Sequence, residues 1–487
     1  MSQTKKTKIV ATLGPALSGN KTKLKELMIS GVNVFRINFS HADYDDVTNN
    51  VNIIRELNKE LDFNVAILAD LQGPKLRVGV MAEGVDLTPG DVFSFTTNTC
   101  EGTQEKAFMT YQQFPKDVKV GEKILVDDGK LLFEVTATNN DDLVTTKVLR
   151  GGPLKSKKGV NLPNTNVSLP ALTEKDIEDA KFALGLEVDW MALSFVRNPA
   201  DLDDIHKLIA ENSDVSVYRT RVISKIEKPE ALENIDAIIA NTDAIMVARG
   251  DLGVEIPMSE VPLAQKMLVR KCKEAKIPVV IATQMMETMI ENSVPTRAEV
   301  NDVANSIMDG ADAVMLSGET SVGAFPNEVI KVMREIILDV ENSSLIEVPR
   351  ESPKLDPDAD KAISNAICYQ AALVAEDVNA KVISTITDTG HTAQQISALR
   401  PKSQILAFSD DRRTLGMMNI MWGVKGRFYE PKTHFSTDVI RDVNNIALQS
   451  GYLAEGDIVV NINSTPIMEK GDVNTLRISK VDLSKLK

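Results

Sequence analysis

The chain has 487 residues, too many for one ordinary domain, and its composition of 43% hydrophobic and 25% charged residues is that of a globular protein rather than a disordered or fibrous one. No segment approaches the ~20 uncharged apolar residues that span a bilayer, and no long apolar stretch of a signal peptide follows the basic N-terminus, so we expect a cytoplasmic protein without a membrane partner. The net charge of -14 argues against nucleic acid as a partner, and an anionic substrate would need a local cluster of Lys and Arg.

The first 75 residues alternate between strand and helix patterns. Apolar runs at residues 8–13, 32–39 and 65–69 predict three strands, and the stretches 21–28 and 45–58 have helical periodicity. The chain therefore opens as βαβαβ.

The pattern changes between residues 78 and 170. Short alternating runs such as 131–138 are broken by turn signals, including Asp128-Gly129 and Gly151-Gly152. We expect an all-β insert here.

Strand and helix patterns resume after the insert, and five further apolar runs bring the number of strands to eight. They lie at residues 190–196, 222–226, 244–248, 278–282 and 313–316. Eight strands that are each followed by a helical segment predict a (β/α)8 barrel. More alternating strands and helices follow a polar linker at residues 349–358, which predicts a C-terminal doubly wound α/β domain.

The predicted organisation is thus an α/β protein with three domains. The catalytic barrel takes residues 1–74 and 171–348, an inserted β-barrel lid takes 75–170, and a C-terminal α/β regulatory domain takes 356–487.

In such barrels the chemistry lies at the carboxyl ends of the strands, so the polar residues that end each run are informative. Because side chains alternate along a strand, Arg36, Asn38 and Ser40 share one face of the second strand, and Lys225 and Glu227 share one face of the fifth. Other strand ends carry Asp70, Asp251 and Thr283. We expect these side chains to meet at the barrel mouth.

The residue types at these ends indicate the chemistry. The carboxylates Glu227 and Asp251 suit Mg2+, and the cations Arg36 and Lys225 suit a phosphoryl group in transfer. Gly250, before a helix start, offers backbone donors to a carboxylate. The ligand predicted by this set is a small phosphorylated acid. For Arg249 a structural ion pair and a catalytic role explain the residue equally well.

Seven segments, in this order along the chain, resemble the signature segments of pyruvate kinases. They are residues 36–41 (RINFSH), 70–77 (DLQGPKLR), 223–227 (ISKIE), 246–255 (MVARGDLGVE), 282–285 (ATQM), 295–305 (PTRAEVNDVAN) and 315–320 (MLSGET). A set of this size is far more specific than one short motif.

The resemblance implies transfer of the phosphoryl group of phosphoenolpyruvate to ADP, giving pyruvate and ATP in glycolysis, by a cytoplasmic homotetramer with a closing lid. It implies that Arg36, Lys225 and Thr283 are catalytic, and that Gly250 and Asp251 also bind substrate. Glu227 and Asp251 would bind Mg2+, or Mn2+ in its place. The residues implied near ATP or ADP are Asn38, His41, Arg77 and Lys158.

Many members of the family need K+, at positions that match Asn38, Ser40, Asp70 and Leu71 here. Those members carry an acidic residue where this chain has Lys75, so the chain resembles the K+-independent branch. A Lys ammonium is a compact monovalent cation, and we expect it to replace K+.

The segment Thr387-Asp388-Thr389-Gly390-His391-Thr392 falls between a strand and a helix start and resembles the family's effector phosphate loop. The candidate phosphate contacts are Thr387, Thr389, Gly390 and Thr392. An ordinary capped helix start is the alternative. Asp388 adds negative charge and residues 464–474 lack a Gly-rich run, so we expect weak or absent activation by fructose 1,6-bisphosphate.

Two other classes remain open from the sequence. One is a different phosphoenolpyruvate-handling barrel, either a mutase or a phosphotransferase with a phosphohistidine carrier. The other is a pseudoenzyme kept as an interaction or metabolite-sensing protein. Pyruvate formation from phosphoenolpyruvate, Mg2+ and ADP would separate them.

Overall fold

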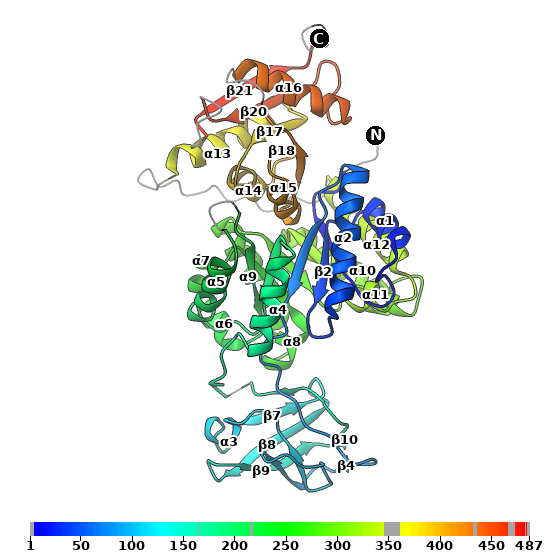
Figure 1. Cartoon of the computed structure of the whole chain (residues 1–487), viewed down its shortest axis with the longest axis vertical. Helices are drawn as coiled ribbons and strands as arrows, with labels where there is room; N and C mark the ends of the chain where they lie inside the picture. The colour runs from blue at the N-terminus through cyan, green and yellow to red at the C-terminus, as the bar shows by residue number, and fades with distance from the viewer. Residues whose placement is uncertain are drawn as a thin grey trace.

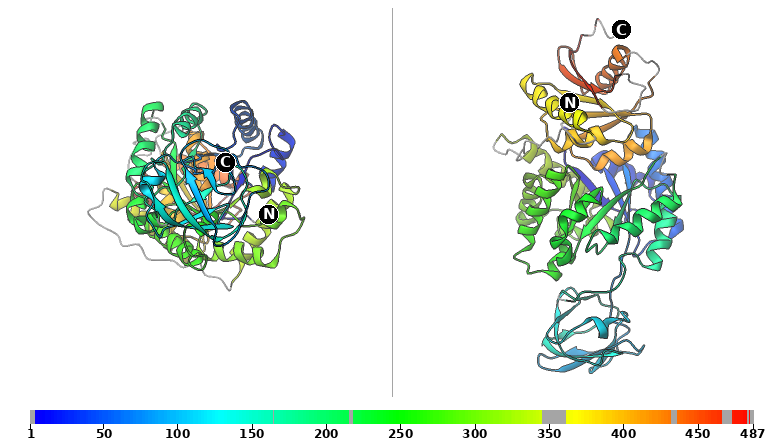
Figure 2. Two further views of the ribbon diagram at one scale, coloured as in Figure 1. Left: turned by 90° about the horizontal axis from the view of Figure 1, so that it is seen from below. Right: turned by 90° about the vertical axis from the view of Figure 1, so that its left-hand side faces the viewer.

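The computed structural model describes residues 4–163, 165–214, 218–344, 361–431, 436–465, 473–482 and 484. Three bodies lie in a row along the long axis, with the barrel between the inserted β domain and the C-terminal α/β domain (Figure 1). The same order is seen from the side in Figure 2. The predicted linker at residues 349–358 lies outside the described residues.

Eight parallel strands form the closed barrel, in the order β1-β16-β15-β14-β13-β12-β3-β2. All eight predicted strands are present, and the largest difference is at the fourth, which was expected to reach residue 196. The strands are β1 (Lys8–Thr12), β2 (Val34–Asn38), β3 (Ala66–Asp70), β12 (Trp190–Leu193), β13 (Arg221–Ile226), β14 (Ala244–Ala248), β15 (Val279–Ala282) and β16 (Ala313–Leu316).

Helices surround the barrel and bury their apolar faces against it (Figure 1). Polar caps set where several of them begin: Thr296 and Glu299, for example, form a reciprocal capping box. No described helix is both long and apolar enough to cross a membrane. The helices are α1 (Lys21–Ser30), α2 (Tyr44–Leu61), α4 (Glu174–Gly185), α5 (Ala200–Asn212), α6 (Pro229–Glu233), α7 (Ile235–Ala240), α8 (Arg249–Glu255), α9 (Val261–Ala275), η1 (Glu287–Ile290), α10 (Arg297–Asp309), α11 (Gly318–Ser321) and α12 (Pro326–Asn342).

The insert leaves the barrel after β3 and returns before α4, as expected. Its strands form a six-stranded sheet in the order β11-β7-β8-β9-β5-β6 and a pair β10-β4. Phe93, Phe95 and Phe133 are fully buried in its own core. The elements are β4 (Asp86–Leu87), β5 (Val92–Thr96), β6 (Lys106–Phe108), α3 (Phe114–Asp117), β7 (Lys123–Val126), β8 (Leu131–Thr138), β9 (Leu143–Arg150), β10 (Gly152–Pro153) and β11 (Val160–Asn161).

The C-terminal domain has a five-stranded sheet in the order β19-β18-β17-β20-β21, in which only β21 is antiparallel to its neighbour. Apolar residues of α13 and α14 pack on one face and those of α16 on the other, so the predicted doubly wound fold is confirmed. The elements are α13 (Ala362–Asp377), β17 (Val382–Ile386), α14 (His391–Ala398), β18 (Gln404–Ser409), α15 (Arg412–Met417), η2 (Met418–Ile420), β19 (Val424–Phe428), α16 (Ser436–Gln449), β20 (Ile458–Asn463) and β21 (Thr475–Lys480). The limits of the three domains, and closure of the insert into a β-barrel, stay predictions.

The C-terminal domain closes the amino end of the barrel. Barrel-interior residues such as Val10 and Met246 belong to one buried cluster with Met418 of the C-terminal domain. The indole of Trp190 donates to the carbonyl of Met417 at 3.0 Å. The two domains therefore share a core, and the opposite, carboxyl end of the barrel is left for the insert.

A buried ion pair fastens this junction. Arg400 Nη1 lies 2.9 Å from Asp312 Oδ1, with the two side chains 2% and 6% exposed, and Arg400 Nη2 donates to the carbonyl of Gly310. Asp312 also accepts the backbone N–H groups of Val279 and Trp422. One carboxylate thus ties two barrel strands to the C-terminal domain.

We predict that Arg400→Met destabilises the fold by about 3–5 kcal/mol, because the substitution leaves Asp312 buried without its counter-charge. Urea unfolding monitored by tryptophan fluorescence measures the change. Arg441→Met is the matched control, since the pair of Arg441 with Asp438 is largely exposed and should be worth at most about 1 kcal/mol. Equal midpoints for the two variants would contradict the prediction.

Candidate active site

A buried carboxylate joins two cations at the carboxyl end of the barrel. Arg36 Nε lies 2.6 Å from Asp70 Oδ2, and Lys225 Nζ lies 3.2 Å from Asp70 Oδ1. The Asp70 side chain is 1% exposed, whereas those of Arg36 and Lys225 are 11% and 12% exposed. Burial by itself would raise the pKa of Asp70, but Lys225 and Arg36 outweigh it and the pKa is lowered. Asp70 is therefore an anion that holds two cations side by side.

Lys225 has two further neighbours that fix its ammonium. Its Nζ lies 3.0 Å from Glu227 Oε1 and donates to Ser194 Oγ at 2.8 Å. Burial opposes the charge, but Asp70 and Glu227 more than offset it, so the pKa of Lys225 is raised. Lys225 remains a cation over the whole physiological pH range.

Glu227 and Asp251 place carboxylate oxygens near this ammonium. Glu227 Oε2 accepts the backbone N–H of Phe195 at 2.7 Å, and its side chain is 1% exposed. Burial raises the pKa of Glu227; Lys225 offsets part of that effect, and the charge of Asp251 adds to it. A divalent cation would relieve the repulsion between these two carboxylates, so the donor set fits Mg2+.

The described residues hold no group of three or more His, Cys, Asp or Glu side chains arranged for a metal. A Mg2+ ion at Glu227 and Asp251 would therefore take its other ligands from substrate or water, which is the usual way this ion is held.

Thr283 lies beside Gly250 in an unusual backbone conformation. Its φ is 68° and that of Gln284 is 55°, a left-handed turn of two non-glycine residues that costs about 1–3 kcal/mol at each. Thr283 Oγ1 accepts the N–H of Gly250 at 2.7 Å and donates to the carbonyl of Ala282. The turn thus presents a hydroxyl next to the first turn of α8.

Arg249, which the sequence left undecided, holds this turn from behind. Its Nη1 lies 2.7 Å from Asp302 Oδ1, and its Nη2 donates to the carbonyl of Thr283 at 2.7 Å. The side chain is 11% exposed. The guanidinium therefore makes the structural ion pair that was one of its two interpretations, together with a contact to the turn.

The residues expected near the nucleotide are distributed over barrel and insert. Lys158 Nζ pairs with Asp127 Oδ1 at 2.8 Å, and Arg77 Nη1 donates to the carbonyl of Lys157 at 3.0 Å, so both are held within the insert. Asn38 Oδ1 accepts the N–H of Ser40 and His41 is exposed, both at the end of β2. Among the described residues, no hydrogen bond or ion pair joins these four side chains to one another.

The positions that match the family's K+ ligands already have partners. Asn38 Oδ1 accepts from Ser40, the Asp70 oxygens face Arg36 and Lys225, and the carbonyl of Leu71 accepts the hydroxyl of Ser194 at 2.7 Å. Lys75 is exposed, and its Cε lies beside Gly159 of the insert. The cations that pair with Asp70 are Arg36 and Lys225.

Sequence reasoning missed Ser194 and Thr12. Ser194 Oγ bridges Lys225 Nζ and the Leu71 carbonyl, and Thr12 Oγ1 accepts from Arg36 Nη1 at 3.0 Å. The signal for both was a hydroxyl residue at the end of an apolar run, at residues 8–13 and 190–196.

A contact between insert and barrel was missed as well. Glu255 Oε1 accepts from Lys228 Nζ and from Asn161 Nδ2 of the insert, both at 2.8 Å. Lys228 follows Glu227 directly, and Glu255 ends the helix that carries Asp251. The insert is thus tied to the segments that hold both carboxylates.

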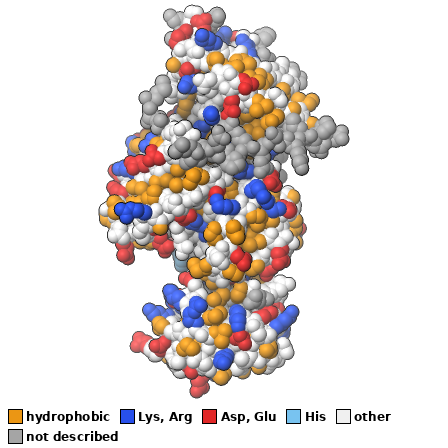
Figure 3. Space-filling model, turned by 180° about the vertical axis from the view of Figure 1, so that it is seen from behind, with side chains coloured by type: hydrophobic (Ala, Val, Ile, Leu, Met, Phe, Trp, Pro, Cys, Tyr) orange, Lys and Arg blue, Asp and Glu red, His pale blue; other side chains and the backbone are white. Residues whose placement is uncertain are grey.

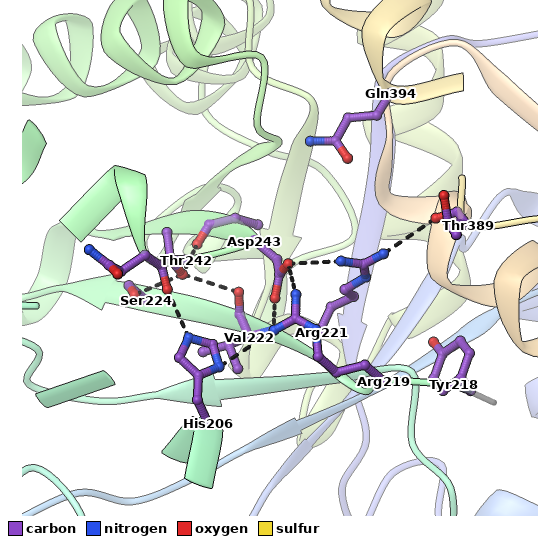
Figure 4. A network of polar contacts seen from close by, with 12 residues as sticks. His206, Tyr218, Arg219, Arg221, Val222, Ser224, Thr242, Asp243, Thr389 and Gln394 are labelled. Atoms are coloured by element: carbon purple, nitrogen blue, oxygen red, sulfur yellow. Dashed lines mark hydrogen bonds and ion pairs between the residues drawn. The ribbon is translucent and has the colours of Figure 1, made fainter. Parts of the chain in front are cut away.

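The candidate effector loop lies against the amino end of the barrel. It connects β17 to α14, and the N–H of Gly390 (φ 78°) is accepted by Thr387 Oγ1. The carbonyl of Thr389 accepts from Arg221 at 3.3 Å, and Arg221 pairs with Asp243 (Figure 4). Thr392 is buried in the first turn of α14.

Comparison with known proteins follows the same division of the chain. Residues 4–330 match the family model described as pyruvate kinase, barrel domain, and residues 365–479 match pyruvate kinase, alpha/beta domain. A pyruvate kinase of Mycobacterium tuberculosis is 41% identical over 484 residues, which is 98% of this chain and 99% of the relative. One of Corynebacterium glutamicum is 40% identical over 475 residues, 97% of each chain.

A crystal structure of a pyruvate kinase from Cryptosporidium parvum has a TM-score of 0.88 and 36% identity, and the match covers 98% of this chain and 96% of that one. Fold, domain order and sequence agree over nearly the full length. The chain therefore belongs to the pyruvate kinase family, whose members are kinase phosphotransferases.

Proposed function

We propose that this chain transfers the phosphoryl group of phosphoenolpyruvate to ADP, giving pyruvate and ATP, at the carboxyl end of the barrel. The observation that carries the proposal is the arrangement of Arg36 and Lys225 on opposite oxygens of buried Asp70. Two cations held by one buried carboxylate suit the equatorial oxygens of a phosphoryl group in transfer.

Arg36 and Lys225 would bind the phosphoryl group, and Lys225 would stabilise the charge that spreads over it in the transition state. Because Asp70, Glu227 and Ser194 already hold the ammonium, no reorganisation is needed when that charge develops. The barrel would thus contribute to catalysis by fixing the two cations before substrate binds.

Glu227 and Asp251 would hold Mg2+, or Mn2+ in its place, and the ion would neutralise charge on the phosphoryl and enolate oxygens. Gly250, Asp251 and Thr283 would bind the substrate carboxylate. For that, the N–H of Gly250 would exchange its bond to Thr283 Oγ1 for one to substrate. Thr283 would then stand next to the enolate carbon and relay a proton to it, directly or through water.

Asn38, His41, Arg77 and Lys158 would bind ADP or ATP when the insert closes as a lid. Closure would bring Arg77 and Lys158 to the barrel mouth and exclude water from the transferring phosphoryl group, which limits hydrolysis. During this movement the hydrogen bond of Asn161 with Glu255 would keep one edge of the insert attached to the barrel.

The remaining parts of the proposal concern assembly and regulation. We propose a cytoplasmic homotetramer, and large apolar side chains left exposed on the barrel, Met258, Leu263 and Val294, are available for subunit contacts. Figure 3 shows hydrophobic side chains at the surface of this part of the molecule. Thr387, Thr389, Gly390 and Thr392 would bind the phosphate of an effector in the C-terminal domain.

We predict that Lys225→Ala lowers kcat by at least ~10³, because the loss of one preorganised charge from a phosphoryl transition state costs about 4 kcal/mol. The Michaelis constant for phosphoenolpyruvate should rise less, since Arg36 remains. A coupled assay for pyruvate measures both. Lys207→Ala, at an exposed pair with Glu211, is the control. A decrease in kcat of less than tenfold in a folded Lys225 variant would show that the role of Lys225 is misassigned. No turnover in the unmodified chain would support a pseudoenzyme.

We predict that Glu227→Gln weakens divalent-cation binding by at least ~10-fold, or about 1.4 kcal/mol. In the unmodified chain a proton competes with the metal for Glu227, whose pKa is raised, so affinity should fall as pH falls through that pKa. Mn2+ binding followed by electron paramagnetic resonance, from pH 5 to 8, measures this without turnover. Glu233→Gln, at an exposed position of α6, is the control. Unchanged Mn2+ affinity in the Glu227 variant would remove this carboxylate from the metal site.

We predict near-full activity in a K+-free tetramethylammonium buffer with Mg2+, and K+ dependence in Lys75→Glu. The physical reason is charge replacement: on closure, the Lys75 ammonium would bring a monovalent cation toward the phosphoryl pocket, and K+ would then meet like-charge repulsion. Lys155→Glu makes the same charge change elsewhere on the insert and is the control. A gain of more than about tenfold when K+ is added to the unmodified enzyme would mean that K+ occupies the site at Asn38, Ser40 and Asp70.

A further inference from the structure

The left-handed turn at Thr283 and Gln284 follows β15 directly and has no glycine to make it easy. A β-branched residue at φ 68° persists only where surrounding contacts determine it. Both residues belong to the run that carries the proposed proton relay. The contacts that hold the turn therefore bear on the reaction.

Arg249 supplies most of those contacts from one side chain. Its Nη2 donates to the carbonyl of Thr283 at 2.7 Å and lies 3.4 Å from that of Gln284, and its Nε lies 3.4 Å from the carbonyl of Ala282. Three consecutive carbonyls thus face one guanidinium. A planar fork with five N–H donors can serve them together, whereas a Lys ammonium is a point charge.

The guanidinium is itself fixed from the other side. Its Nη1 pairs with Asp302 Oδ1 at 2.7 Å and lies 3.4 Å from Gln265 Oε1, so α10 and α9 both hold it. Asp302 is 34% exposed and Arg249 only 11%. The arginine is thus anchored on the helix layer and reaches inward to the turn.

Arg249 is also the residue before Gly250, whose N–H donates to Thr283 Oγ1 at 2.7 Å. The Thr283 carbonyl is bound by the Arg249 side chain and its hydroxyl by the next backbone amide. Residues 249 and 250 therefore contact both the carbonyl and the hydroxyl of Thr283, and the Arg249 contact is the one that stays when the Gly250 N–H turns to substrate.

We propose that Arg249 is a positioning residue whose guanidinium holds the left-handed turn so that the Thr283 hydroxyl faces the reacting acid. The proposal rests on the proposed role of Thr283 in protonating the enolate. In that step the enolate carbon forms one C–H bond, the proton leaves Thr283 or a water bound to it, and solvent returns a proton to that oxygen. No oxidant or reductant is involved.

The test is exchange of the methyl hydrogens of pyruvate with D2O, which is the proton step run in both directions, followed by proton NMR with Mg2+ and ATP present. Arg249→Lys should slow this exchange by at least ~10-fold, since small misplacement of a reacting group has effects of this size. In a Thr283→Ala background the same substitution should change the exchange rate by less than ~2-fold, because the two residues act as one unit.

Two further variants separate positioning from stability. Asp302→Asn removes the ion pair but keeps an acceptor for Arg249, so it should lower the melting temperature more than the exchange rate. Arg270→Lys, at an exposed pair with Glu274 on α9, should change neither. If Arg249→Lys does not fold, Arg249→Gln, which keeps two N–H donors, takes its place with the same outcomes.

Exchange within ~2-fold of the unmodified enzyme in the Arg249 variant, or fully additive effects of the Arg249 and Thr283 substitutions, would overturn the proposal. If Thr283→Ala alone left exchange unchanged, the proposed role of Thr283 would fail first. That result is distinct from one in which Thr283→Ala slows exchange and Arg249→Lys does not.

Discussion

The active end of this barrel depends on one buried carboxylate. Arg36 on β2 and Lys225 on β13 are like charges that would repel each other at the distance a phosphoryl group requires, and Asp70 on β3 gives each of them one oxygen. Burial of a lone carboxylate destabilises its charged form. The lowered pKa of Asp70 means that the two cations stabilise that form by more than burial destabilises it. The three charges are stable only together. Glu227 lies between Lys225 and Asp251 in the same group of charges. Its pKa is raised, because Lys225 offsets only part of the effect of burial and of the Asp251 charge.

Three strands of the barrel, including β13, which carries Lys225, are also held at their amino ends. At the amino end Trp190 begins β12 and binds the Met417 carbonyl, Arg221 begins β13 and reaches Thr389, and Asp312 precedes β16 and pairs with Arg400. The apolar interior continues from the barrel into the C-terminal domain without a break. A (β/α)8 barrel can close its own amino end; here a second domain does so. The position of the barrel strands therefore depends on two domains that pack as one core.

Much of this architecture follows from local patterns. The barrel strands are buried on both faces and so read as short apolar runs, and turn residues separate them, which is why all eight were predicted with small errors. The insert alternates with period two because one face of its sheet packs on a core. Alternation also gave the inward set Arg36, Lys225 and Glu227, since those residues lie within or at the very end of regular strands.

The features that could not be predicted lie just beyond strand ends, where the alternation rule stops applying. Gly73, Phe195, Thr283 and Gln284 all have φ between 55° and 70° and follow β3, β12 and β15. At each left-handed residue the chain changes direction, so the alternation of side chains along a strand no longer predicts where the next side chain points. The turn at Phe195 aims an N–H at Glu227, the turn at Thr283 brings three carbonyls to Arg249, and the turn at Gly73 sends Lys75 toward Gly159 rather than Asp70. A sequence shows which residues end a strand. Which way the next side chain points is decided by a backbone torsion whose cost is met by contacts far away in the chain, and those contacts exist only in the folded barrel.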